Sequence, residues 1–295
     1  MAADVVSVQK EDLPSGLIAV NRIPLSRNTQ VLLVCGALAL LLAFILGQAI
    51  TSAYFPAGLK KQGGIPAKVG PVEVIAVVTD DFYPSDWKSD PRIKPVAETI
   101  DHQEFERIIP LTRSFAAEYP EGILAKNLKG ACFCKTLKFY GKDFGGTNSA
   151  DRIYICVKSK ELGYTDQYVL SSMHHEFSSI LMRNYPFPSK AWAALNPKGF
   201  SYTDDAVGAL EKDDLLNPKS KHHESGFICL YSQSSMEEDF NTIADYLFNQ
   251  RPALLKLGLK YPKLRAKIQL AMKFYKSVDA RFAFGELEAL NKYSN

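Results

Sequence analysis

The sequence has little excess charge, because 35 lysines and arginines stand against 32 aspartates and glutamates, for a formal net charge of +3. It has no RNP-type motif and no strongly basic stripe, so nucleic-acid binding has no support. It also lacks internal repeats and low-complexity tracts. With 46% hydrophobic and 23% charged residues among 295, the chain has the composition of a folded protein of one or two domains.

Cysteine is scarce as well. Cys35 lies in an apolar segment near the N-terminus, and four cysteines remain: Cys132, Cys134, Cys156 and Cys229. The first two of these form a C-x-C, which lacks the C-x2-C spacing of a zinc knuckle and has no paired second half. We expect buried thiols in strands, and the alternative is a disulfide that joins Cys132 or Cys134 to Cys156.

The long apolar run begins with VLLVCGALALLLAFILG, which has no charge and no proline. A helix of about 20 residues spans the hydrocarbon core, so we predict a transmembrane helix at 31–54. A cleaved signal peptide is the rival interpretation, but its apolar core is usually shorter and follows a short basic segment. The chain then divides into an N-terminal tail (1–30), this helix, a linker rich in glycine and proline (55–70) and an extramembrane domain (71–295).

The orientation of this helix does not follow from charge, because the lysines and arginines that flank it are equally frequent on both sides. We place the N-terminus in the cytoplasm, because a short tail is the easier one to retain. The C-terminal domain is then periplasmic or otherwise extracytoplasmic, and the protein is a single-pass protein of the lipid bilayer.

One face of the predicted span carries small residues spaced four apart: Cys35, Ala39, Ala43, Gly47 and Thr51. Such a stripe lets two transmembrane helices approach closely, because packing drives their association in lipid. Small residues are also common in transmembrane helices without a special role. Both interpretations stay open, and the stripe suggests packing against other membrane protein subunits as partners only if it is a contact face.

The extramembrane domain mixes strand and helix patterns. We predict buried strands at 71–78 (PVEVIAVV) and 151–159 (DRIYICVKS), the second after a turn that contains Gly145 and Gly146. Helical patterns dominate from Asp166 onward. This order predicts an α+β domain.

The most informative segment is DQYVLSSMHHEFSSILMRNYP. Its apolar residues recur at helical spacing: Val169, Leu170, Met173, Phe177, Ile180 and Leu181. The opposite face carries Ser172, His175, Glu176 and Ser179. In zinc peptidases, H-E-x-x-H places two histidines on one helical face to bind zinc, and the glutamate polarises the bound water. Here the second histidine is Ser179, a poor neutral ligand, and a frame that starts at His174 also ends at a serine.

A second helix begins at SSMEEDFNTIADYLFNQ, with Phe240, Ile243, Ala244, Leu247 and Phe248 on its apolar face. Glu238, Asn241 and Asp245 share the other face, where Glu238 could supply a third metal ligand. The alternative is a capping box with Ser235, in which the Glu238 side chain reaches back to the helix start. The pattern alone favours the cap.

Three segments, and the order in which they follow one another, resemble the zinc-binding metallopeptidases of bacterial surface lipoproteins, the substrate-import-associated zinc metallohydrolases. The segments are HHEFSSIL, NYPFP and GFICLYSQSSMEEDF. That family reads HHEFAHIL, a short Tyr-Pro segment, and GF-x-x-x-YA ending in an E-D-F helix. The similarity extends over residues 72–292. It implies a zincin-like domain of the gluzincin type, with a small sheet and active-site-type helices.

The resemblance also implies roles for single residues. His175 and Glu238 become metal ligands, Glu176 the general base, and Tyr231 an oxyanion partner. Two departures from the family pattern bear on function. Ser179 stands where the second histidine belongs, which leaves the H-E-x-x-H motif degenerate, and a transmembrane helix replaces the lipoprotein cysteine.

The remaining histidines and the basic C-terminal stretch have simpler interpretations. His222 and His223 are candidates to replace the lost ligand, but in a loop rich in lysine and serine we expect them to be solvated. We expect His102 on the surface. The basic residues at the C-terminus should form the wet face of amphipathic helices, with attachment to anionic lipid as the alternative. They are Lys256, Lys260, Lys263, Arg265, Lys267, Lys273 and Lys276.

Three functions remain open. The first, which the degenerate motif favours, is a non-catalytic zincin-like subunit (a pseudoenzyme) with a structural or binding role in a membrane protein complex, without a cofactor. The second is a membrane-anchored zinc metallopeptidase that uses a rearranged ligand set. The third is a tethered domain that binds a small molecule or a glycan.

Overall fold

The computed structural model describes residues 67–203 and 220–293, which lie within a compact unit that extends from Gly63 to Asn295. The predicted transmembrane helix at 31–54, with its stripe of small residues, lies outside the described residues. Within the described ranges, no helix combines the length and the apolar character needed to cross a membrane.

Five strands of the described chain form one sheet in the order β1-β2-β4-β8-β7. Their bounds are β1 (Ala67–Val69), β2 (Val72–Ile75), β4 (Gly130–Cys134), β7 (Gly146–Asn148) and β8 (Arg152–Cys156). The β2-β4 and β4-β8 pairs are parallel, whereas β1 and β7 pair antiparallel at the two edges. All of β4 is buried, as expected for a central parallel strand that is covered on both faces.

A smaller sheet has the order β3-β5-β6, with β3 (Val96–Glu98), β5 (Thr136–Phe139) and β6 (Lys142–Asp143) paired antiparallel. The β5-β6 turn places Tyr140 and Gly141 at φ 55° and 75°. Two successive positive φ angles are typical of the type I′ turn that suits a two-residue hairpin. The short helix α2 (Ser85–Ser89) precedes this sheet in the chain.

Helices make up most of the C-terminal half, as the sequence pattern predicted. They are α5 (Asp166–Asn184), α6 (Ser189–Ala194), α8 (Ser220–Ser225), α9 (Met236–Asn249), α10 (Arg251–Lys260) and α11 (Pro262–Val278), followed by the 3₁₀ helix η4 (Gly285–Lys292). Before the first of them come α3 (His102–Ala117), α4 (Ile123–Asn127) and the 3₁₀ turn η2 (Lys160–Leu162), and η3 (Tyr231–Gln233) precedes α9. The described chain is therefore a mixed α+β structure with small sheets.

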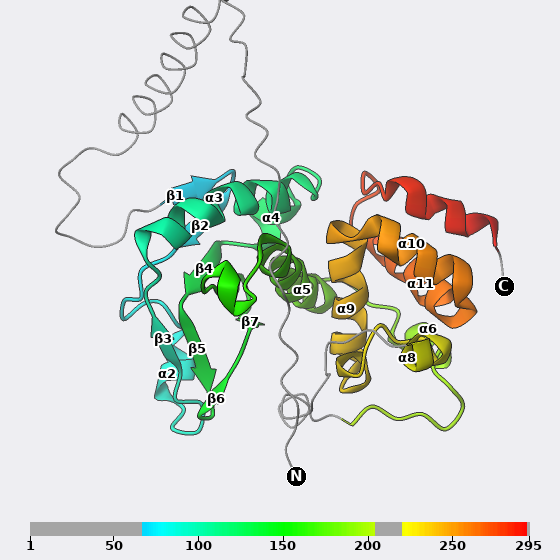
Figure 1. The fold of residues 1–295 in the computed structure, drawn as a ribbon, viewed down its shortest axis with the longest axis horizontal. Helices are drawn as coiled ribbons and strands as arrows, with labels where there is room; N and C mark the ends of the chain where they lie inside the picture. Colours follow the sequence, from blue (N-terminus) through cyan, green and yellow to red (C-terminus); the bar gives the residue numbers. More distant parts are fainter. Residues whose placement is uncertain (1–66, 204–219, 294–295) are drawn as a thin grey trace, which may run out of the picture. The chain divides into compact units, whose positions relative to one another are not determined.

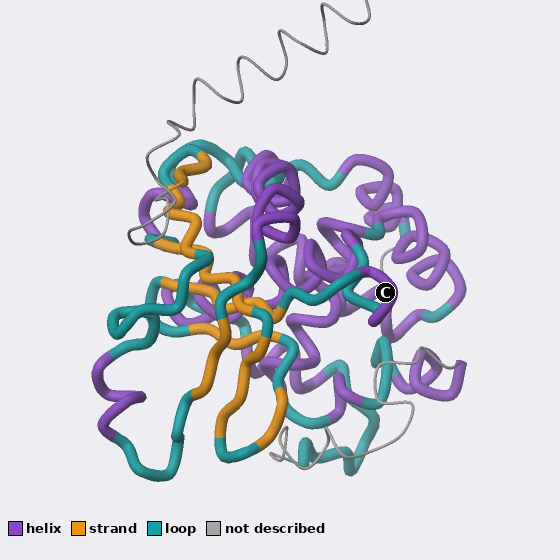
Figure 2. Tube along the Cα trace, turned by 60° about the vertical axis from the view of Figure 1, so that its left-hand side comes forward, coloured by secondary structure: helices purple, strands orange, loops and turns teal. Residues whose placement is uncertain are grey.

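The long helix α5 lies in the middle, between the strands and the C-terminal helices (Figure 1; Figure 2). The hydroxyl of Thr165 accepts a hydrogen bond from the Tyr168 N–H and so caps the start of α5. Buried side chains lie all around this helix, including the predicted apolar face and also His174, Glu176, Ser178 and Ser179. On the polar face of α5, Glu176 and Ser179 are therefore enclosed by protein, whereas Ser172 and His175 are half-buried.

Some expected boundaries are wrong. The strand predicted at 71–78 ends at Ile75, and the one predicted at 151–159 covers only Arg152–Cys156. The last residues of the predicted linker form β1, because a turn at Gly70, with φ 57°, folds them back onto β2. Backbone pairing with a neighbouring strand decided these limits, and that pairing is not visible in local sequence.

The thiols of the described cysteines are free and buried, as predicted: Cys132, Cys134, Cys156 and Cys229. Burial raises the pKa of each, to about 12 for Cys132. The first three pack with Phe82, Tyr83 and other aromatic residues in a core between the sheets. They serve as small apolar side chains.

Lys267 departs from the expected wet face, because its side chain is fully buried on α11. Its ammonium donates to Asp239 Oδ2 at 2.6 Å and lies 3.8 Å from the centroid of the Phe227 ring. Trp192 Nε1 and the Tyr202 hydroxyl donate to the same oxygen, at 2.8 and 2.6 Å. This buried ion pair joins α6, α9 and α11, and it explains why one lysine of the basic stretch points inward.

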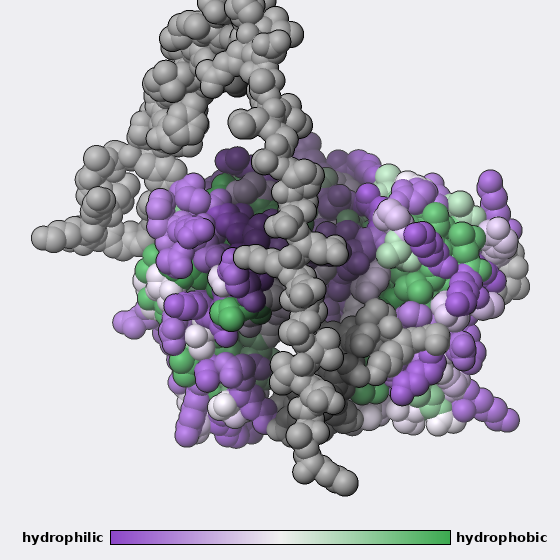
Figure 3. Space-filling view, viewed as in Figure 1, coloured by the Kyte–Doolittle hydropathy of each residue, from purple (hydrophilic) through white to green (hydrophobic). Residues whose placement is uncertain are grey.

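The outer surface of the same helices is mixed. Figure 3 shows apolar and polar surface side by side over the C-terminal helices, where Leu259 is 46% exposed. Lys256, Lys260, Lys263 and Lys273 are exposed, as the amphipathic pattern predicted.

Candidate functional site

The two polar helical faces singled out in the sequence meet where α5 packs against α9. His175 Nε2 and Glu238 Oε2 lie 2.8 Å apart, and each side chain is 16% exposed. Burial acts to lower the pKa of His175, but the charge and hydrogen bond of Glu238 outweigh it and raise that pKa to about 9. The pair is therefore a charged hydrogen bond that links the two helices.

Glu238 also has its predicted place at the helix start. Its backbone N–H donates to the Ser235 hydroxyl at 3.1 Å, which is one half of the capping box. Its carboxylate contacts His175 on the neighbouring helix. The half of the capping box in which the Glu238 side chain reaches back to the helix start is not found in the described chain, because that carboxylate bonds to His175.

Glu176 is 8% exposed and lies against β7. Its Oε2 accepts a hydrogen bond of 2.6 Å from the Asn148 amide. A Cβ atom at Gly146 would come within 2.7 Å of Glu176 Oε1, so only glycine leaves room for this carboxylate. Burial raises the pKa of Glu176 to about 7, although His175 and Asn148 act to lower it.

Ser179, which stands in place of the second histidine, is 1% exposed. Its hydroxyl accepts a hydrogen bond of 2.7 Å from the Asn241 amide on α9. Asn241 is itself buried, and its Oδ1 has no partner among the described residues. The position that a zinc ligand would occupy is thus taken up by a serine–asparagine contact.

The donors here are fewer than a zinc site uses. Zinc sites have at least three protein ligands, whereas here His175 and Glu238 bond to each other at 2.8 Å. In residues 67–203 and 220–293, no three His, Cys, Asp or Glu side chains converge in a metal-binding group. The donor set is two residues that satisfy each other, and Ser179 supplies no third ligand.

Tyr231, on η3, lies beside His175, with ring centroids 6.2 Å apart and nearly parallel planes. Burial raises the pKa of its phenol well above the usual range, and the Glu238 and Glu176 carboxylates raise it further. The phenol therefore stays protonated and can donate a hydrogen bond. The structure brings together all four residues to which the resemblance assigns roles.

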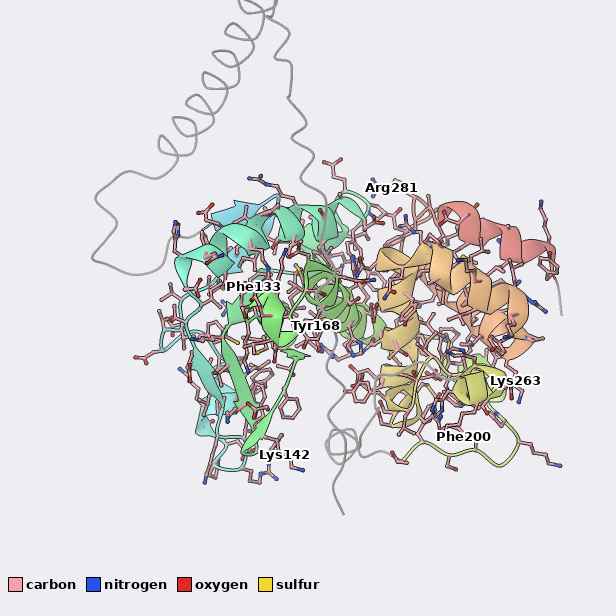
Figure 4. The ribbon with its side chains drawn as sticks, in the orientation of Figure 1. Phe133, Lys142, Tyr168, Phe200, Lys263 and Arg281 are labelled. Carbon is pink, nitrogen blue, oxygen red and sulfur yellow. The ribbon has the colours of Figure 1, made fainter. Side chains whose placement is uncertain are left out.

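An open pocket of about 190 Å³ lies next to this group, between the β7 edge of the sheet and the helices α5 and α9. Among its lining residues are His175, Glu176 and Asp245, the last of which accepts a hydrogen bond of 2.8 Å from the Ser171 hydroxyl. Burial raises the pKa of Asp245 to about 6. Tyr168, labelled in Figure 4, lines the pocket next to the turn that leads into β7.

His174, the neighbour of His175, belongs to the core instead. Its Nδ1 lies 2.8 Å from the Tyr119 hydroxyl, and its ring stacks on Phe248 at 5.0 Å. Burial lowers the pKa of His174 to about 3. A helix turns by about 100° per residue, so the two adjacent histidines have opposite environments.

The expectation that His222 and His223 are solvated is wrong. Both are 7% exposed, on α8. His222 Nδ1 lies 2.9 Å from Gln233 Nε2, and the His223 ring packs on Tyr261. Neither histidine lines the pocket beside His175. His102 is exposed, as expected. Packing of the short helix α8 on α11 buries the two histidines.

One residue of the site, Asn148, escaped the sequence analysis, which placed Asn241 and Asp245 on the polar face of the second helix without giving them a role. Asn148 lies in a short strand far from α5 in the chain, and only pairing with β8 brings it to Glu176. Asn241 and Asp245 follow Glu238 at helical spacing on the polar face of α9. That spacing was a usable signal for both residues, but it does not identify their partners.

The described chain is an α+β domain in which α5 and α9 carry the candidate site. Residues 152–277 match the profile of the family described as "Putative zinc-binding metallo-peptidase". This segment contains His175, Glu176, Tyr231 and Glu238. The resemblance predicted from the sequence is thereby confirmed. Because that family is described as zinc-binding, zinc is the ion to test in this chain.

Among solved structures, the chain is similar to a "putative zinc-binding metallo-peptidase" from Bacteroides caccae, with 17% sequence identity and a TM-score of 0.37. The alignment covers 62% of this chain and 65% of the other, so the chain spans less than two thirds of that relative. Among curated proteins, no significant match is found.

Proposed function

We propose that this protein is a zinc-free relative of these metallopeptidases, a pseudoenzyme that serves as a binding or structural subunit of a membrane protein complex. One observation carries the proposal. Ser179 replaces the second histidine, and its hydroxyl is buried and bonded to Asn241. A general base such as Glu176 has no metal-bound water to activate without the metal.

The hydrogen bonds of the site support this proposal. His175 with Glu238, and Asn241 with Ser179, connect α5 to α9 at two positions one turn apart. In a zinc peptidase, shared metal ligands join such helices, and here hydrogen bonds do so. The scaffold is retained while the ligand set is replaced.

The proposal includes the membrane anchor. The apolar run at 31–54 supports a transmembrane helix, preceded by a cytoplasmic tail and followed by a linker to the domain. The stripe of small residues on this run supports packing against other membrane subunits. Complex membership, extracytoplasmic location and gluzincin-type ancestry are parts of this proposal.

Zinc analysis of the purified full-length chain tests the proposal. We expect well under one zinc per chain, and no change on His175→Ala or on the control His102→Ala. Because Ser179 is enclosed, Ser179→His alone should overpack the site, at a cost of about 1–3 kcal/mol. Ser179→His combined with Asn241→Ala makes room, and we expect this double variant to bind zinc measurably.

Stoichiometric zinc in the wild-type protein that disappears on His175→Ala contradicts the proposal. It would favour the metallopeptidase with a rearranged ligand set. The adjacency of His175, Glu176 and Glu238 is the observation on which that second candidate rests.

A further inference from the structure

Two carboxylates that line the pocket have only neutral hydrogen-bond partners in the described chain. Glu176 accepts from the Asn148 amide, and Asp245 accepts from the Ser171 hydroxyl. Neither forms an ion pair with a lysine or arginine of residues 67–203 or 220–293. The imidazole of His175, the positive group beside them, is already bonded to Glu238.

One atom in particular points to a ligand. Glu176 is more than nine-tenths buried, its Oε2 accepts from the Asn148 amide, and its Oε1 lies against Gly146 at the pocket wall. A buried carboxyl group costs free energy unless a bound proton, a cation or several donors compensate its charge, and above about pH 7 Glu176 no longer keeps the proton. The pocket is the open side from which such a donor can reach Oε1.

The rest of the pocket suits an organic cation. Rings of Phe144, Tyr168 and Tyr231 line it, and aromatic faces attract ammonium groups. A divalent metal ion suits it less, because no group of three ligating side chains converges in the described ranges. The volume of about 190 Å³ is below the roughly 300–1,000 Å³ of typical ligand pockets, so it favours a single aliphatic chain.

We propose that this pocket binds a primary alkylammonium group, whose N–H donors bond to Glu176 and Asp245 while its apolar stem contacts the aromatic rings. The group is either a free aliphatic amine or the side chain of a lysine on a partner protein. This inference rests on the proposed function, since zinc bound to His175 and Glu238 would compete for the same space and charge.

Calorimetric titration of the full-length chain in mild detergent tests the inference. The probes are cadaverine, with 1-pentanol as its uncharged control, and a short lysine-containing peptide, with its Nε-acetylated form as control. We expect both ammonium probes to bind and both controls to fail. Tighter binding of the peptide identifies a partner's lysine as the natural ligand, and tighter binding of cadaverine identifies a free amine.

Variants locate the site. Asp245→Asn and Glu176→Gln should each weaken ammonium binding at least about tenfold, the effect of losing one charge-assisted hydrogen bond. Glu286→Gln, an exposed residue on η4, is the matched control and should leave the affinity unchanged. Circular dichroism confirms that each variant is folded.

Zinc content measured in the same sample separates the two proposals. Stoichiometric zinc refutes the proposed function. Zinc-free, folded protein that binds neither ammonium probe at 10 mM, roughly the weak end of specific binding, refutes the alkylammonium site alone. Binding that survives both Asp245→Asn and Glu176→Gln also refutes it, because the amine would then lie elsewhere.

Discussion

Replacement of Lys267 by methionine should strongly destabilise the domain. The lysine and Asp239 are both fully buried, and their charged atoms are 2.6 Å apart. Methionine keeps much of the side-chain volume but removes the ammonium. Asp239 Oδ2 would keep its bonds from Trp192 and Tyr202, while Oδ1, which has no partner among the described residues, would remain unpaired.

The magnitude follows from the burial of the pair. Removal of one partner of a buried ion pair costs about 3–5 kcal/mol, because the other charge stays behind in a low-dielectric interior. The lost contact of the ammonium with the Phe227 ring, at 3.8 Å, is part of this cost. For a domain of this size, 1 kcal/mol corresponds to about 2–4 °C in Tm, so we expect Tm to fall by about 6–20 °C.

Thermal unfolding followed by intrinsic fluorescence measures this effect, because Trp192 is buried at the same place. Lys273→Met, an exposed lysine on the same helix, is the control and should change Tm by less than about 2 °C. Asp239→Asn combined with Lys267→Met should recover at least half of the loss, since no unpaired charge remains. If Lys267→Met melts within 2 °C of wild type, the reasoning from buried charge is wrong.

Two other outcomes are expected. Folded His174 binds a proton only below about pH 3, whereas the unfolded residue does so below about pH 6.5. Its contribution to stability is therefore fully present above pH 6.5 and should decline as pH falls, by about 2 kcal/mol at pH 5. Urea unfolding of wild type and His174→Gln at pH 7 and pH 5 measures this decline, and an equal change in stability for both proteins would contradict the prediction. In the predicted membrane span, Ala43→Leu with Gly47→Leu should release the protein from the proposed complex in mild detergent, whereas Leu41→Ala with Phe44→Ala should matter less. Undiminished co-purification of the first variant with its partners would mean that the helix is only a tether.

The helices that carry the site were predictable because their signals are local. Apolar residues at helical spacing identified α5 and α9, and Ser235 identified the start of α9 as a capped end. The order of motifs around His175 and Tyr231 was enough to indicate the family. Each of these signals extends over only a few turns of chain, so the sequence displays it directly.

The partners of the site residues were not predictable from local signals. The pattern favoured a cap role for the Glu238 side chain, and only the packing of α9 against α5 shows that this carboxylate bonds to His175 while the Ser235 hydroxyl caps the helix. Packing likewise enclosed His222 and His223, which composition had assigned to a solvated loop.

The sequence by itself determined the loss of the second histidine, the helices of the site and the apolar run near the N-terminus. Tertiary structure decided that Ser179 bonds to Asn241, that Glu176 bonds to Asn148, and that an open pocket remains beside them. The physical reason is the separation along the chain over which each interaction acts. Helix formation and capping depend on neighbours within about four residues, whereas a buried polar group is satisfied by whichever side chain the fold brings into reach.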